Sequence, residues 1–419
     1  MKKLFCFFAV TFCLLVLQAQ NIGIGTKTPN PTAILHIETG TTNKGLVITG
    51  AYNPAAVIPN FSEGGRMLFY PARAAFRAGY SNVVAWSNDN IGNLSIGLGT
   101  NTMAKGEYST AFGANTIATG VVATAMGNST IASGAVSTSM GEGSLAKGNY
   151  STAMGYYSTA AGSYSTAMGF GSYAKGYSST VVGLFNDSVL NNDQTQPPQG
   201  NNFPLFIVGN GSSNISRSNA MVVTSQGRVG IGANFPYAPL HVRSNSTVFD
   251  PQIWLEEYGN DFARLTFSND VNANYWTVAA LPQPTNPASL MNFYYKGFGD
   301  VLSLHGDGTA WLAGTLTQNS DARLKTNILP ISSSLTNIIQ LEGYQYKWKD
   351  ENRDQDIQFG LLAQEVQKVF PELVKKDAKD VLGVNYNGFI PLLINSIKEQ
   401  QYTIQALEKR LSAMEEKLK

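Results

Sequence analysis

The chain has 419 residues, of which 43% are hydrophobic and only 14% are charged. Its 29 basic and 28 acidic residues nearly cancel, so the charge favours neither nucleic acid nor an anionic membrane surface as a partner. The 41 glycines and 19 tyrosines are more typical of an extended β protein than of a cytosolic enzyme, and the length allows two or three domains.

Residues 1–20 have the pattern of a secretory signal peptide. Two lysines precede an apolar run, residues 4–17, that is too short to span a membrane. Both cysteines of the chain, Cys6 and Cys13, lie within this run. We therefore expect an exported mature chain without disulfides and without an integral membrane segment. The sequence identifies no surface anchor.

Residues 21–94 are predicted to form an N-terminal β module and a cap. The module begins with Asn21-Ile-Gly-Ile-Gly25, and a near-copy returns at Arg228-Val-Gly-Ile-Gly232. Paired Gly-x-Gly turns occur in phosphate-binding loops, but both copies lack the third glycine and a βαβ frame. A strand, turn and strand is the better interpretation. The proline-broken stretch 46–93 would then cover the first coil of the following segment.

Residues 95–185 repeat every fourteen residues. Such a period predicts a solenoid of short strands, in which glycine supplies a positive φ or a close approach. Recurring Met, Ile and Leu would form an apolar ladder from coil to coil, which a disordered Gly/Ser/Thr linker would not maintain. The remaining Ala, Ser and Thr give a thin core that neighbouring copies would complete. Two glycine series define the repeat: Gly99, Gly113, Gly127, Gly141, Gly155, Gly169 and Gly183, and Gly106, Gly120, Gly134, Gly148, Gly162 and Gly176.

The motif S-T-A-M-G-x-x-S-x-A-x-G within this segment resembles the head repeat of YadA-type trimeric surface adhesins. The resemblance implies a left-handed parallel β-roll built as a homotrimer. It covers about 90 of the 419 residues, and seven copies of the first half-motif keep its register.

Residues 186–203 are predicted to form a linker, and residues 204–318 are predicted to form a β domain. Its aromatic side chains form either a sugar-stacking face or, as we favour, core and intersubunit packing. Its carboxylates could supply a glycosidase pair, but such residues are more often solvated surface. The aromatic residues are Trp254, Tyr258, Tyr275, Trp276, Tyr294 and Tyr295, and the carboxylates are Asp250, Glu256, Glu257, Asp261 and Asp270.

Residues 319–389 contain the sharpest local motif, Asn319-Ser-Asp-Ala-Arg-Leu-Lys325. By pattern alone, a serine and a lysine five residues apart are weak grounds for catalysis, because Ser-Asp commonly starts a helix. The downstream segments, including Phe359-Gly-Leu-Leu-Ala-Gln-Glu365 and Val384-Asn-Tyr386, change that interpretation. Together they resemble the C-terminal intramolecular chaperone of endosialidase-type phage tailspikes.

This resemblance implies self-cleavage by a Ser–Lys dyad, with Ser320 as nucleophile and Lys325 as base. Lysine acts as a base only when desolvation or a cationic neighbour lowers its pKa, and Arg323 is a candidate for the second effect. The family places the cut between Ser320 and Asp321. The Asn319–Ser320 bond stays an alternative, because Ser320 Oγ reaches the Asn319 carbonyl more easily than its own. Gln364 and Glu365 belong to the supporting motif.

Residues 390–419 show heptad spacing and predict a coiled coil. Ile at a and Leu at d favour two strands by residue type, whereas both resemblances imply three. An amphipathic helix folded on its own domain is the alternative. The seam consists of Ile390, Leu393, Ile397, Gln400, Ile404, Leu407, Leu411, Met414 and Leu418.

We therefore expect an exported trimeric fibre or adhesin-like protein with a C-terminal chaperone domain that drives assembly and is removed by self-cleavage. The alternative is a tailspike-like protein that binds or degrades glycans. No cofactor is predicted. The three histidines, His36, His241 and His305, show no metal-ligand spacing, so no metal site is predicted either.

Overall fold

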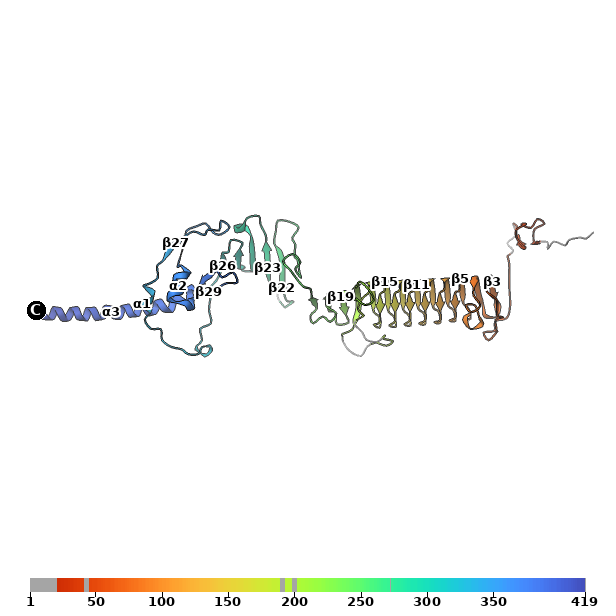
Figure 1. Ribbon diagram of the computed structural model, residues 1–419, viewed down its shortest axis with the longest axis horizontal. Helices are drawn as coiled ribbons and strands as arrows, with labels where there is room; N and C mark the ends of the chain where they lie inside the picture. The colour runs from red at the N-terminus through yellow and green to blue at the C-terminus, as the bar shows by residue number, and fades with distance from the viewer. Residues whose placement is uncertain (1–20, 41–44, 189–192, 198–201, 272, 419) are drawn as a thin grey trace, which may run out of the picture. The chain divides into compact units, whose positions relative to one another are not determined.

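The computed structural model describes residues 21–40, 45–188, 193–197, 202–271 and 273–418. The chain divides into two compact units, Met1–Gln252 and Ile253–Lys419. Short strands dominate the first unit, and the second combines an antiparallel sheet with α-helices (Figure 1). The predicted mainly β fold class is confirmed. The predicted signal peptide, residues 1–20, lies outside the described residues.

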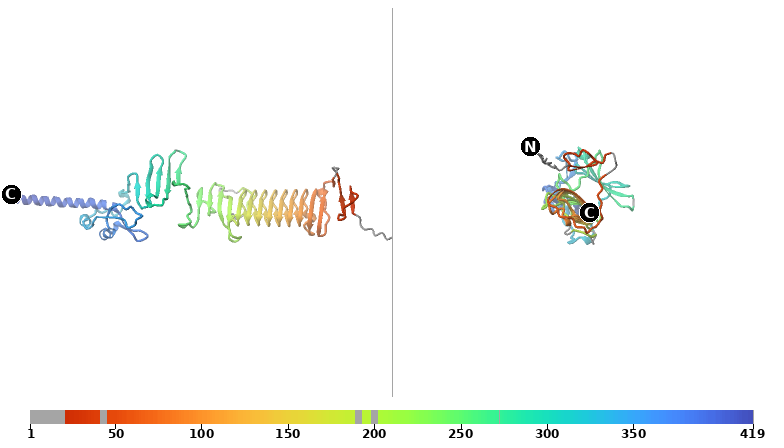
Figure 2. Two further views of the ribbon diagram at one scale, coloured as in Figure 1. Left: turned by 90° about the horizontal axis from the view of Figure 1, so that it is seen from above. Right: turned by 90° about the vertical axis from the view of Figure 1, so that its right-hand side faces the viewer.

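The repeat segment is a β-solenoid in which long and short strands alternate along the chain (Figure 2). All long strands pair in parallel in one sheet and all short strands in another, with fourteen-residue steps such as Met140 opposite Met154. The long strands are β5 (Ile96–Thr100), β7 (Thr110–Ala114), β9 (Thr124–Asn128), β11 (Thr138–Glu142), β13 (Thr152–Tyr156), β15 (Thr166–Phe170) and β17 (Thr180–Leu184). The short strands are β6 (Met103–Ala104), β8 (Ile117–Ala118), β10 (Ile131–Ala132), β12 (Leu145–Ala146), β14 (Thr159–Ala160) and β16 (Tyr173–Ala174).

Both glycine series lie close to the backbone of the next coil, and the first series also needs a positive φ. Gly127 represents the first series and has φ +112°, in the left-handed region that favours glycine. Gly134 represents the second series, where the requirement is space. A Cβ on Gly134 would lie 2.0 Å from the carbonyl oxygen of Gly148 in the next coil. Both roles that the sequence predicted for glycine are therefore present.

The interior of the solenoid is filled by alanine, serine and threonine. Six alanines of the short strands are fully buried: Ala104, Ala118, Ala132, Ala146, Ala160 and Ala174. The predicted ladder of larger side chains is present but lies outside this core, because alternate strand residues point to opposite faces. Ala125 is fully buried while Met126 beside it is 37% exposed, and Phe112 in the same ladder is 49% exposed. The single chain thus leaves an apolar surface partly uncovered.

The N-terminal end of the solenoid is covered by the hairpin of β3 (Gly64–Tyr70) and β4 (Ala75–Ser81), and β4 pairs in parallel with β5. The side chain of Arg77 fills the first coil and is fully buried. The Trp86 ring is also buried, and its Nε1 donates to the Thr102 carbonyl at 3.0 Å. A separate two-stranded sheet, β1 (Ile22–Ile24) with β2 (Leu35–Ile37), precedes this cap.

At the other end, Asn186 replaces the next short strand. Its buried amide accepts from the Tyr173 N–H at 2.6 Å and donates to the Tyr173 carbonyl at 3.0 Å, as a strand backbone would. The long-strand sheet continues through β18 (Pro204–Asn210), β19 (Asn219–Thr224), β20 (Val229–Ile231) and β21 (Leu240–Val242). Within the segment predicted as one β domain, 204–318, residues up to Val242 thus extend the solenoid sheet.

The second unit begins with an antiparallel sheet of β22 (Ala263–Ser268), β23 (Tyr275–Leu281), β24 (Leu290–Tyr295), β25 (Gly299–His305) and β26 (Ala310–Leu312). Two hairpins follow, β27 (Tyr344–Tyr346) with β28 (Gln358–Gly360) and β29 (Val374–Lys376) with β30 (Leu382–Val384). The helices are α1 (Ser334–Ile338), α2 (Ala363–Val369) and α3 (Phe389–Leu418). Short 3-10 turns are η1 (Pro71–Arg73), η2 (Asn88–Asn90), η3 (Asn286–Ala288), η4 (Ala322–Leu324), η5 (Pro371–Leu373) and η6 (Tyr386–Gly388).

Helix α3 has two different apolar faces. Phe389, Leu392 and Ser396, spaced three and four residues apart, are buried. Phe389 and Leu392 pack in one core with residues of α2, η5 and β29. The heptad seam lies on other positions, and its side chains are exposed, for example Ile397 at 65%. The start of the helix therefore folds on its own domain without using the seam.

Candidate functional site

The two residues of the predicted dyad contact each other in the structure. Lys325 Nζ lies 2.7 Å from Ser320 Oγ and donates a hydrogen bond to it. The one-turn helix η4 between them brings the two side chains together, and Asp321 caps this turn by accepting from the Arg323 N–H at 2.8 Å. Both dyad residues are exposed in the single chain. A hydroxyl and an amine at this distance can exchange a proton directly.

Arg323 contacts Asp321. Its guanidinium donates to the Asp321 carboxylate, with a shortest distance of 2.6 Å. This hydrogen bond raises the pKa of Arg323 and lowers the pKa of Asp321. The carboxylate partly offsets the positive charge that was expected to act on Lys325.

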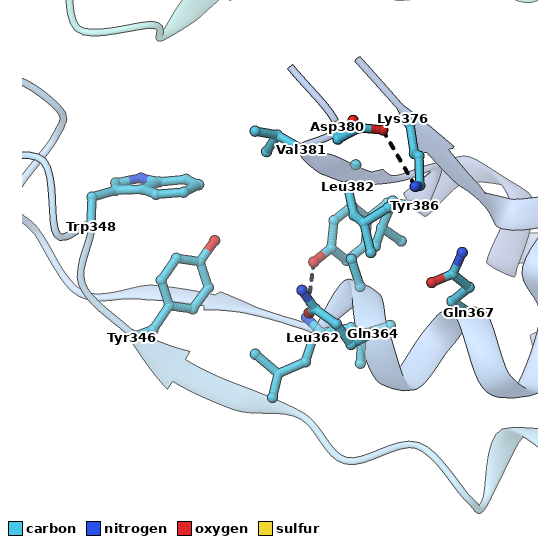
Figure 3. A pocket seen from close by; sticks show the side chains of 14 residues that line it. Tyr346, Trp348, Leu362, Gln364, Gln367, Lys376, Asp380, Val381, Leu382 and Tyr386 are labelled. Carbon is cyan, nitrogen blue, oxygen red and sulfur yellow. Dashed lines mark hydrogen bonds and ion pairs between the residues drawn. The ribbon is translucent and has the colours of Figure 1, made fainter. Parts of the chain in front are cut away.

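The supporting residues Gln364 and Glu365 lie in the first turn of α2. Glu365 Oε1 accepts from the Tyr344 hydroxyl at 3.0 Å, and this bond raises the pKa of Tyr344. Gln364 lines a hollow of about 730 Å³ between the two hairpins and α2. Figure 3 shows Tyr346 and Trp348 on one side of this hollow and the Lys376–Asp380 pair on another. The dyad and the supporting residues thus make separate contacts in the single chain.

A second polar contact joins α1 to α3. The Glu399 carboxylate accepts from the Ser334 N–H at 3.0 Å and from the Leu335 N–H at 2.9 Å. These backbone groups have no partner within a helix at its first turn, so Glu399 satisfies both. Sequence reasoning missed this contact because the two segments are far apart in the chain.

The aromatic residues considered for a sugar-stacking face are distributed over two faces. Tyr275 and Tyr294 lie on one face of the sheet, while Trp276 and Tyr295 lie on the other, because strand residues alternate. Trp254 and Tyr258 belong to no strand and are exposed. The six residues therefore do not form the single face that was considered as the alternative to packing.

The Tyr275–Tyr294 face contains a hollow of about 480 Å³. The two rings are 6.3 Å apart, and Thr266, Thr277 and Arg264 also line the hollow. Asn292, which is 4% exposed, donates to Asp300 at 2.9 Å, while its Oδ1 is buried without a hydrogen-bond partner. The hollow thus combines aromatic rings with polar groups.

The five carboxylates considered for glycoside hydrolysis are all exposed. Asp261 pairs with Arg264 at 2.7 Å, and this hydrogen bond lowers the pKa of Asp261. Within the described ranges, no group of three His, Cys, Asp or Glu side chains could hold a metal ion. The part of the chain that the structure describes also has no helix long and apolar enough to cross a membrane.

Two families match segments of this chain. Residues 320–375 match the family described as chaperone of endosialidase, Peptidase_S74. Residues 91–116, 137–158 and 160–185 match the YadA head domain repeat. These are the two families that the motifs resemble.

The chain is also similar to long tail fibre proteins of phages. It is 37% identical over 87 residues to the long tail fiber protein Gp37 of Escherichia phage AR1, covering 19% of this chain and 8% of that protein. It is 31% identical over 134 residues to Gp37 of Salmonella phage S16, covering 29% of this chain and 18% of that protein. The matched parts thus span less than a fifth of either relative. The chain thus joins a segment that matches the YadA head repeat to a segment that matches the endosialidase chaperone family.

Proposed function

We propose that this chain is an exported or surface-exposed trimeric fibre, adhesin-like in its solenoid, whose C-terminal segment is an assembly chaperone. The two family matches and the similarity to phage tail fibres support this function. Long-range parallel β pairing is slow and exposes strand edges during folding. A C-terminal segment that aligns three chains removes much of the entropic cost of starting the solenoid.

The observation that carries the trimer is the free seam of α3. The helix uses Leu392 and Ser396 for its own domain and leaves the heptad positions exposed, including Leu411 at 60%. Exposed apolar residues at a and d positions are stabilised when parallel helices bury them together. The same requirement applies to the half-exposed ladder of the solenoid, where a second and third copy would cover Phe112 and Met126.

The native mass of the full chain tests this proposal. Leu411→Asp places a charge in the seam, whereas Ala413→Asp places the same charge two residues away, outside the seam. We expect three chain masses for the wild type and for Ala413→Asp, and loss of most of the trimer for Leu411→Asp. A wild-type protein of one chain mass would overturn the proposal.

We also propose that the Ser320–Lys325 dyad cleaves its own chain once. Neutral Lys325 accepts the Ser320 hydroxyl proton, and Oγ attacks a backbone carbonyl carbon. The C–N bond then breaks as the lysine returns the proton to the leaving nitrogen, and water hydrolyses the ester. The 2.7 Å contact supports the proton transfer. Burial of the exposed dyad in the assembled trimer would supply the desolvation that Lys325 needs.

Chemical geometry determines which copy's serine can attack each of the two candidate bonds. Attack by Ser320 Oγ on the Asn319 carbonyl closes a five-membered ring, whereas attack on its own carbonyl closes a strained four-membered ring. Cleavage of the Ser320–Asp321 bond therefore requires attack by the serine of another copy.

Wild type, Ser320→Ala and Lys325→Met are compared by intact mass, with Thr317→Ala and Lys347→Met as controls. We expect a released piece beginning at Ser320 or Asp321 in the wild type and controls only. Equal cleavage in Ser320→Ala would refute the dyad.

The second candidate function is saccharide binding at the Tyr275–Tyr294 hollow. Sugars stack on aromatic rings and satisfy buried polar atoms, and the Asn292 Oδ1 is such an atom. Tyr294→Ala removes one ring of the hollow, and Tyr295→Ala removes a ring from the opposite face as the matched control. On a microarray of bacterial polysaccharides, we expect Tyr294→Ala to lose signal that Tyr295→Ala retains. Equal signal in both variants would exclude the hollow.

A further inference from the structure

The N-terminal sheet and the end of the solenoid contain two copies of one structural module. In the first, Ile22 pairs with Leu35 and Ile24 with Ile37; in the second, Val229 pairs with Leu240 and Ile231 with Val242. The flanking hydrogen bonds also agree, with Glu38 N–H donating to Ile24 O at 2.8 Å and Arg243 N–H donating to Ile231 O at 2.9 Å. Gly25 and Gly232 both have a positive φ, +82° and +65°.

The second module has a strand that the first lacks. The outer edge of β20 pairs with β19 in antiparallel register, Met221 opposite Ile231 and Val223 opposite Val229. Two further bonds lie at the ends of this ladder, Gly232 N–H to Ala220 O at 3.0 Å and Thr224 N–H to Arg228 O at 2.9 Å. The corresponding edge of β1 is open within the described residues, since its sheet contains only β1 and β2.

A segment with the character of β19 is present near the first module, but it is not in a sheet. Gly45-Leu-Val-Ile-Thr49 matches Ala220-Met-Val-Val-Thr224 position by position in size and polarity. It belongs to no strand, and Leu46, Val47 and Ile48 are 66%, 80% and 50% exposed. Its downstream end is held at the cap, where Asn53 N–H donates to Ala72 O at 2.7 Å. An apolar β-prone segment and an open strand edge are both aggregation risks unless they are paired.

We propose that residues 45–49 of one copy add to the β1 edge of a second copy as an antiparallel strand. The register of the second module sets the pairs, with Leu46 opposite Ile24 and Ile48 opposite Ile22. Gly45 then accepts from Gly25, as Ala220 accepts from Gly232. Within the described residues, each copy offers one open β1 edge and one unpaired 45–49 segment, so cyclic exchange among three copies pairs every such edge with a segment. The inference rests on the trimer proposed above and locks its N-terminal end.

Disulfide cross-linking tests the register. Leu46–Ile24 and Ile48–Ile22 correspond to pairs without mutual hydrogen bonds, in which Cβ atoms come close enough for a disulfide. Full-length chains carry Cys6→Ser and Cys13→Ser with either Ile24→Cys plus Leu46→Cys or Ile22→Cys plus Ile48→Cys. Ile24→Cys plus Val47→Cys is the matched control, because Val47 points to the other face of the strand. Single-cysteine chains exclude bonds between identical positions.

We expect both designed pairs to give covalent trimers on a non-reducing denaturing gel, in at least tenfold higher yield than the control pair. If the thiols are consumed but the denatured protein keeps the mass of one chain, the disulfide lies within one chain. That result would overturn the exchange, because residues 45–49 would then pair with the β1 edge of their own chain. If the thiols stay free in a protein whose native mass is that of a trimer, the strand exchange is overturned but the trimer is not. A protein of single-chain native mass would overturn the trimer as well.

Discussion

Arg77 holds a charge inside the N-terminal cap, and its replacement tests how the cap is stabilised. Burial lowers its pKa from the ordinary arginine value to about 10, which corresponds to about 3 kcal/mol against the charged form. Its guanidinium donates to Phe76 O, Ser95 O, Ser95 Oγ and Ala104 O at 2.8–3.0 Å. The desolvation penalty of the buried charge, increased by an Nε that has no hydrogen-bond partner, offsets much of what these four bonds contribute.

The carbonyl acceptors keep other partners when the guanidinium is removed. Ser95 O also accepts from Phe76 N–H at 3.0 Å, and Ala104 O accepts from Gly92 N–H at 2.8 Å. We therefore expect Arg77→Met, which fills the space without the charge, to change the free energy of unfolding by less than about 1 kcal/mol. Arg77→Ala leaves a cavity and should cost about 2–5 kcal/mol. Urea unfolding followed by circular dichroism measures both. A Met variant as unstable as the Ala variant would refute the reasoning.

Three further substitutions test other parts of the structure. Gly134→Ala should lower the free energy of unfolding by about 3 kcal/mol or more, because its Cβ displaces the next coil and breaks several backbone hydrogen bonds. Exposed Ser133→Ala is the control, and equal melting temperatures of the two variants would contradict the close approach. Ala123→Ser should stabilise the coil by about 1 kcal/mol, because Ser137 at the equivalent position donates to Gly134 O at 2.6 Å; no gain in thermal stability would count against it. Glu399→Gln should destabilise the C-terminal unit by about 1–2 kcal/mol, because the charge-assisted bonds to α1 are lost. Exposed Glu408→Gln is the control in the same melting experiment. An unchanged melting temperature for Glu399→Gln would show that the α1 contact is not needed for stability.

The sequence predicted the solenoid because its period is short and every copy keeps its glycines. The same regularity predicts both glycine roles, as Gly127 and Gly134 show. It did not reveal that the repeat continues after the interruption. Gly209 lies opposite Gly183 and Val208 opposite Val182. The Ile-Val-Gly motif of β18 therefore continues the long-strand sheet by one more strand in the same register. The intervening residues break the fourteen-residue spacing, and only the Val-Gly match could have revealed it.

The candidate site was predictable in part. The Ser320–Lys325 contact followed from a local motif, since five residues and one tight turn suffice to form it. The Arg323–Asp321 pair was missed, although adjacent opposite charges were a visible signal. The division of the aromatic residues between two faces was missed because the grouping ignored the alternation within β23 and β24. The Glu399 contact needs tertiary structure and has no signal in the sequence.

The central claim is that the C-terminal segment templates the trimer. The most direct test compares the native mass and yield of the uncleaved Ser320→Ala chain with those of a chain ended after Gln318. We expect Ser320→Ala to form trimers. We expect the shortened chain to give single chains or aggregates, with less than a tenth of the trimer yield. An equal yield of trimer from the shortened chain would show that the solenoid assembles without a chaperone.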